Sequence, residues 1–141
     1  MDDVQHTPFE DELRHWASGS PPLGAAVELL LHAGLAKEGD PWLIYDPRSG
    51  VRGIDFDCAL AHTDELTGSE QQLLRIAVSL GAGLPIDLGD VVPGLRYNDA
   101  ELVMIAVAHA AGCTTVTGIG GTGESMRLEP VPPLAVWPHG P

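Results

Sequence analysis

Apolar residues recur at helical spacing in two long stretches in the second half of the chain. Thr67 and Glu70 stand three residues apart in front of the first stretch, and Asn98 and Glu101 stand in the same relation at the second. This is the spacing of a capping box, in which the first side chain accepts a hydrogen bond from an amide at the helix start and the second reaches back to the amide of the cap itself. The pattern predicts one helix from about Gly68 to Leu80 and another from about Asp99 to Ala111.

Both predicted helices carry an apolar stripe that suits a buried core. The first stripe consists of Leu73, Leu74, Ile76, Ala77 and Leu80, and the second of Leu102, Val103, Ile105, Ala106 and Ala110. We expect Gly81, Gly83 and Pro85 to end the first helix, and Gly112 to end the second in a left-handed conformation. The loop between the helices mixes apolar residues with Asp and Gly, which predicts that it packs onto the core.

The beginning of the chain predicts two more helices. Thr7 stands directly before Pro8, and Ser20 directly before Pro21. A Ser or Thr cap followed by proline at the first helical position is the preferred chemistry for a helix start. We expect the first of these helices to bury Phe9, Leu13 and Trp16. We expect the second to bury Leu23, Ala26, Val27, Leu30 and Leu31, and to end at Gly34 or Gly39.

A β-hairpin is predicted over about residues 42–57. Two β-prone runs flank Asp46–Gly50, which places Pro and Gly where a turn needs them. Alternation along the second run predicts that Asp55 and Asp57 share one face of the strand. Asp57 is also a candidate cap for a short third helix.

From Cys113 onward, the composition shifts to Gly, Thr and Pro, and helical periodicity ends. The chain therefore divides into a globular helical domain with a hairpin, residues 1–112, and a tail, residues 113–141, that is either flexible or packed back on the domain. A short strand at Thr114–Thr117 is the one element expected in this tail. The predicted fold class is α+β, mainly α, with about five helices, one β-hairpin and a Gly/Pro-rich C-terminal tail.

Two motifs in the tail allow a functional interpretation. Gly118–Gly123 matches G-x-G-x-x-G, but Pro130 stops any helix behind it and no βαβ unit remains, which favours a linker over a nucleotide site. Pro130–Pro133, followed by Trp137, resembles a polyproline ligand with one aromatic anchor. The alternative is that this stretch folds back over the domain with Trp137 as its anchor.

Charge narrows the classes of partner. Twenty acidic residues face seven basic ones, which gives a net charge of −13, and no two basic residues are adjacent. Direct binding to nucleic acid or to an anionic membrane is therefore disfavoured, whereas a protein partner with a basic surface is favoured. Solubility alone is the alternative reason for such a charge. The acidic start lacks the features of a signal peptide, so we expect a cytoplasmic protein.

The densest candidate chemistry is a group of acidic residues with one histidine. Asp55, Asp57 and His62 are the candidate metal ligands, because carboxylate oxygens on one strand face suit a divalent cation. The candidate partner-binding residues are Asp55, Asp57, Asp64, Glu65 and Trp137.

Residues 68–112, from GSEQQLLRIAVSLGAG to VMIAVAHAAG, resemble a pattern in small uncharacterised actinobacterial proteins. In that pattern a capped helix, an apolar loop with aspartates and a second helix ending in AHAAG follow one another. The resemblance covers about a third of the chain and implies a folded domain of bacterial type, with no activity attached to it.

These observations predict a small acidic module that binds a protein partner, with an inhibitor or antitoxin-like factor as a sharper version. No catalytic residue and no cofactor are expected in that case. One alternative is a metal-dependent hydrolase that uses Asp55, Asp57 and His62. Another is a self-associating structural domain, a homodimer in which the apolar helix faces continue across the interface.

Overall fold

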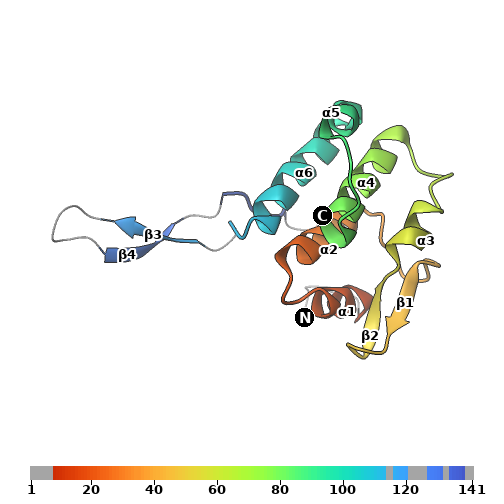
Figure 1. The fold of residues 1–141 in the computed structure, drawn as a ribbon, viewed down its shortest axis with the longest axis horizontal. Helices are drawn as coiled ribbons and strands as arrows, with labels where there is room; N and C mark the ends of the chain where they lie inside the picture. The colour runs from red at the N-terminus through yellow and green to blue at the C-terminus, as the bar shows by residue number, and fades with distance from the viewer. Residues whose placement is uncertain (1–7, 114–115, 121–126, 132–133, 139–141) are drawn as a thin grey trace, which may run out of the picture.

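The computed structural model describes residues 8–113, 116–120, 127–131 and 134–138 (Figure 1). The elements in chain order are α1 (Pro8–Trp16), α2 (Pro21–His32), β1 (Leu43–Asp46), β2 (Val51–Ile54), α3 (Phe56–Leu60), α4 (Gly68–Ala82), α5 (Leu88–Val91), the 3-10 turn η1 (Val92–Gly94), α6 (Tyr97–Ala110), β3 (Val116–Gly120) and β4 (Arg127–Val131). The predicted fold class, α+β and mainly α, is confirmed.

Helix α2 lies at the centre of the fold. It packs against α4 and α6, and its N-terminal neighbour α1 packs against both α2 and strand β2 (Figure 1). The core consists mainly of aliphatic side chains, because aromatic residues make up only 5% of the chain. Its largest fully buried side chains are Leu13, Val27, Leu29, Leu30, Leu73, Val78 and Val91.

Two of the predicted helix starts are confirmed by their capping bonds. The Ser20 hydroxyl accepts a hydrogen bond from the backbone N–H of Leu23 and caps α2. At α4, Thr67 Oγ1 accepts from the N–H of Glu70 at 3.2 Å, and Glu70 Oε1 accepts from the N–H of Thr67 at 3.0 Å. The cap predicted at Thr7 lies outside the described residues, although α1 does begin at Pro8.

Helix α4 continues past the predicted stop at Gly81. It ends at Ala82, and Gly83 takes the left-handed conformation with φ +77°. A Cβ atom on Gly81 would lie 2.6 Å from a ring carbon of Phe56 and 3.1 Å from the Cβ of Ala26. Gly81 therefore serves close packing between elements and not helix termination.

The capping box predicted at Asn98 is wrong. Helix α6 begins at Tyr97, its cap residue Arg96 makes no side-chain capping bond, and Asn98 is exposed. Instead the hydroxyl of Ser69, from α4, accepts a hydrogen bond from the N–H of Arg96 at 2.8 Å and donates one to the carboxylate of Asp99. A tertiary contact thus fixes the start of α6, and local sequence spacing carries no sign of it.

The predicted hairpin is confirmed, but the predicted strand face is not. Strands β1 and β2 are antiparallel, with Leu43 opposite Ile54 and Asp46 opposite Val51. The second strand ends at Ile54, where Asp55 Oδ1 accepts a hydrogen bond from the N–H of Cys58 at 3.1 Å and caps α3. Asp55, and not Asp57, is therefore the cap, and the two carboxylates do not alternate along a strand.

A second antiparallel hairpin, β3–β4, lies in the segment predicted as a tail. Gly118 pairs with Glu129, and Thr117 pairs with Pro130. Figure 1 shows this hairpin extending away from the helices. Pro130 fits here because in a two-stranded ladder each strand has an unpaired edge. The first half of the G-x-G-x-x-G motif is thus part of a strand, and its second half lies outside the described residues.

Candidate interaction surface

One side of α6 is buried and the opposite side is apolar and exposed. Val103 and Ala106 are buried in the core shared with α2. On the other side, Tyr97 is 86% exposed, Met104 72% and Val107 54%. Residues seven and three positions apart lie on the same side of a helix, so these three side chains form one stripe.

Exposed apolar side chains continue beyond both ends of α6. Leu88 and Val92 lie in α5 and η1, directly before its N-terminus. At the C-terminal end, the N–H of Leu134 donates a hydrogen bond to the carbonyl of Cys113 at 2.9 Å, which places the segment 134–138 beside the end of α6. We call the following residues the α6 surface: Leu88, Val92, Tyr97, Met104, Val107, Leu134 and Val136.

Charged side chains flank the α6 surface mainly at its N-terminal end, where Asp87, Asp90 and Arg96 are exposed beside Leu88, Val92 and Tyr97. Along α6 itself, Glu101 is the charged residue on the exposed side, one turn before Met104. Apart from Glu101 and His109, α6 is apolar all round after its first turn. A helix that is apolar all round is normally covered on all sides. The apolar residues on every side of α6 were therefore visible in the sequence. The stripe predicted for the core left out Met104 and Val107, which are exposed.

Trp137 holds the C-terminal segment 134–138 against α2 and α6. Its indole ring stacks on the His32 ring, with centroids 4.8 Å apart and planes 11° apart. Its Nε1–H donates a hydrogen bond to His109 Nδ1 at 2.9 Å. In the described residues, Trp137 thus packs back on the domain, which is one of the two alternatives predicted for Pro130–Trp137.

An ion-pair cluster lies behind the stacked rings. Glu28 of α2 accepts hydrogen bonds from Arg14 Nε at 2.8 Å and is 3.3 Å from His32 Nε2. Burial disfavours the charged form of Glu28, but the bonds from His32 and Arg14 outweigh it and lower its pKa from 4.5 to about 2. The cluster thus links α1, α2 and the C-terminal segment.

A pocket of about 420 Å³ opens beside this cluster, between α1, α2 and the end of α6. Arg14, Glu28 and His109 line it, together with backbone of the α1–α2 turn. These three side chains are already engaged with one another or with Trp137. Within the described residues, no buried side-chain nitrogen or oxygen lacks a hydrogen-bond partner, so the lining of this pocket offers no unpaired buried polar group to a ligand.

The acidic residues predicted as a site lie around α3. Asp57, Asp64 and Glu65 are exposed. Asp64 and Glu65 line a second pocket, of about 400 Å³, together with His62. Their role in partner binding, with that of Asp55 and Trp137, stays a prediction.

The candidate metal ligands do not converge. Asp55 Oδ1 is used for the α3 cap, and His62 Nδ1 lies 2.8 Å from the carbonyl oxygen of Cys58. In the part of the chain that the structure describes, no three His, Cys, Asp or Glu side chains are placed to hold a metal ion.

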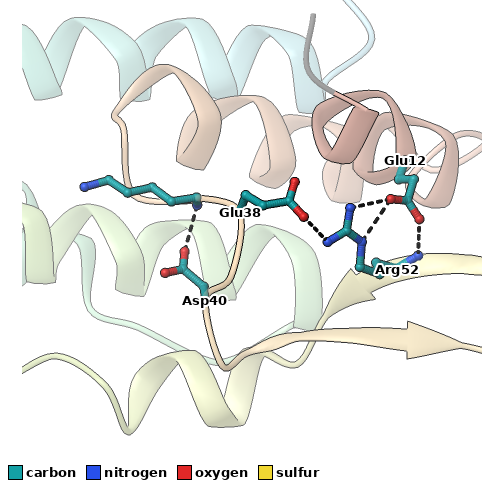
Figure 2. Close-up of polar contacts among 5 residues, drawn as sticks. Glu12, Glu38, Asp40 and Arg52 are labelled. Atoms are coloured by element: carbon teal, nitrogen blue, oxygen red, sulfur yellow. Dashed lines mark hydrogen bonds and ion pairs between the residues drawn. The ribbon is translucent and has the colours of Figure 1, made fainter.

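A second ion-pair cluster joins α1 to the hairpin. Figure 2 shows Arg52 of β2 between two carboxylates: its Nε donates to Glu12 at 2.9 Å and its Nη1 to Glu38 at 2.6 Å. The bond from Arg52 lowers the pKa of Glu12, and the bonds to Glu12 and then Glu38 raise the pKa of Arg52. Nearby, Asp40 accepts from the backbone N–H of Lys37. These carboxylates are therefore engaged in holding the fold together.

Comparison with known protein families, with curated proteins and with solved structures gives no match for this chain. The resemblance to actinobacterial proteins therefore stays a prediction. Among the described helices, none combines the length and the apolar character needed to cross a membrane.

Proposed function

We propose that this chain is a protein-interaction module whose α6 surface contacts a protein partner. The observation that carries the proposal is the exposed apolar side of α6, with Tyr97, Met104 and Val107 in one stripe. Contiguous exposed apolar patches mark interaction sites, and aromatic residues and Met are enriched in the cores of interfaces.

The charge of the chain supports a partner with a basic surface. A net charge of −13 steers encounter with a basic protein and opposes contact with nucleic acid. The exposed carboxylates of Asp57, Asp64 and Glu65 contribute to the negative electrostatic potential around α3. The apolar stripe on α6 is the part of the surface that loses its water when the partner binds. The proposal includes a cytoplasmic location, with an acidic inhibitor or antitoxin-like factor as its specific form.

The test compares two exposed tyrosines. The double variant Tyr97→Ser/Met104→Ser alters the α6 surface, and Tyr45→Ser, at a side chain 65% exposed on β1, is the matched control. Each chain is used to capture proteins from lysate of the source organism at low and at high salt. We expect one protein to be retained by the wild type and by Tyr45→Ser, and its capture to fall at least about 10-fold with the double variant, as for truncation of interface anchors.

The salt dependence tests the second part of the proposal. Capture of that protein is expected to weaken at high salt, because salt screens the attraction between acidic and basic surfaces. Equal capture by all three chains, each shown to be folded by circular dichroism, would contradict a role for the α6 surface.

A further inference from the structure

We infer that the C-terminal segment 134–138 is a pH-dependent latch on α2 and α6, closed by a hydrogen bond that only neutral His109 can accept. The indole Nε1–H of Trp137 is a donor and has no acceptor function. His109 Nδ1, at 2.9 Å, must therefore offer a lone pair. Protonation of the imidazole turns both ring nitrogens into donors, so the bond is lost and two N–H groups face each other.

The latch controls how the segment presents its apolar side chains. Along residues 134–138 exposure alternates: Ala135 and Trp137 are half-buried, whereas Leu134 and Val136 are exposed. An extended chain points successive side chains to opposite sides. Docking of Trp137 therefore turns Leu134 and Val136 outward as part of the α6 surface. Opening of the latch at acid pH then removes Leu134 and Val136 from the α6 surface. This consequence for binding rests on the proposed function.

The other ionisable groups around His109 come from α1 and α2. Arg14 and Glu28 line the same pocket as His109 and are paired with each other. His32 stacks on the face of the Trp137 indole, whereas the His109 ring meets the indole at 67°, and His32 Nε2 lies 3.3 Å from Glu28. On α6 itself, Glu101 lies eight residues before His109, about 12 Å along the helix axis, and the thiol of Cys113 follows four residues after His109.

The bond from Trp137 to His109 sets the response of the latch to acid. His32 can donate from Nε2 to Glu28 in either charge state, so its contacts do not depend on this bond. A protonated His109 loses the bond from Trp137 and favours the open latch. Because the closed state excludes the proton on His109 Nδ1, it holds fewer protons at that residue, and closure is favoured at high pH and lost as the pH falls.

The experiment follows Trp137 by nuclear magnetic resonance at about pH 8 and pH 5, the range in which histidines change charge. The readouts are the indole Nε1–H resonance of Trp137, assigned with Trp137→Phe, and the nuclear Overhauser effects between the Trp137 and His32 rings. At pH 8 we expect these effects to be present. At pH 5 we expect them to be lost, while the indole resonance of Trp16, which bonds to Asp46, reports an intact fold.

His109→Asn is the decisive variant, because its amide oxygen is bonded to Cγ as Nδ1 is and accepts the same N–H without titrating. We expect it to keep the ring contacts at both pH values, and the variant His32→Gln to keep the Trp137 indole transition of the wild type. An unchanged wild-type spectrum between the two pH values, or the same transition in His109→Asn, overturns the latch. If His109→Asn is unfolded, the ring protons of wild-type His109 decide: they must titrate together with the loss of the ring contacts, and a separate titration overturns the inference.

The proposed function is tested independently of the latch. If the resonances behave as expected and no protein is captured at pH 8, the latch stands and the proposed function fails. If a partner is captured through α6 and the Trp137 resonances do not change with pH, the interaction module stands and the latch fails.

Discussion

Helices α2 and α6 have nearly the same composition and opposite surroundings. After their first turns both are apolar apart from one glutamate and one histidine: Glu28 and His32 in α2, Glu101 and His109 in α6. Between residues 23 and 32, no side chain of α2 is exposed, because α1, α4 and α6 surround it. Helix α6 packs against α2 and α4 on one side and exposes its other side to solvent.

This difference shows that the apolar character of a helix does not by itself determine whether the helix is buried on all sides. Both helices satisfy the pattern of a buried helix, but the chain supplies enough neighbours to cover only α2. The uncovered side of α6 is then a property of the whole fold. That side is where we propose the partner binds.

The largest effect is expected from matched truncations in the two helices. Leu30→Ala removes a fully buried side chain of α2 and should lower the free energy of unfolding by about 2–5 kcal/mol. Met104→Ala removes a side chain from the exposed side of α6 and should change it by less than about 0.5 kcal/mol. Urea denaturation measures both. A loss at Met104→Ala as large as that at Leu30→Ala would show that the exposed side of α6 is packed in solution.

A smaller effect is expected from the two glutamates. Glu28→Gln removes the charge that accepts from Arg14 and His32, and should cost about 1–3 kcal/mol at pH 7, whereas Glu101→Gln, at an exposed position, should stay within about 0.5 kcal/mol.

The two glutamate variants should also differ in acid. The pKa of Glu28 is lowered from 4.5 to about 2 in the folded state, so the unfolded chain binds the extra proton first. Its stabilisation is present above pH 4.5 and is lost as the pH falls toward 2. Stability measured across this range should fall less steeply for Glu28→Gln than for Glu101→Gln. Parallel profiles would contradict the paired state of Glu28.

The smallest effect concerns the starts of α4 and α6. Thr67→Ala removes the bond that the N–H of Glu70 donates to Thr67 Oγ1 and should cost about 1 kcal/mol, whereas the backbone N–H of residue 67 still bonds to Glu70 Oε1. Asn98→Ala should change stability by less than about 0.5 kcal/mol, because Asn98 does not cap α6. Thermal unfolding of the two variants, measured side by side, separates them. If Asn98→Ala lowered the stability as much as Thr67→Ala, Asn98 would cap α6 in solution, as the spacing of Asn98 and Glu101 predicted.

The sequence located the elements whose limits depend on neighbouring residues. The caps at Ser20 and Thr67, the turn at Asp46–Gly50 and the left-handed Gly112 follow from side chains or backbone freedom within a few residues. The acidic character of the chain is also fixed by composition alone. One prediction failed between two local signals, because Asp55 caps α3 and does not alternate with Asp57 along a strand. Another failed against a distant contact, because Ser69, and not Asn98, bonds to the start of α6.

Only the tertiary structure decided which apolar surfaces are covered and which polar groups meet. Ser69 binds the start of α6 from a position 27 residues away from Arg96, and Trp137 reaches His109 from a position 28 residues away. Amphipathic spacing describes one helix at a time, whereas burial depends on how many neighbours the chain can place around it. The sequence therefore determined the long helices, the β1–β2 hairpin and the charge, and packing determined that α2 lies in the core and that one side of α6 is exposed.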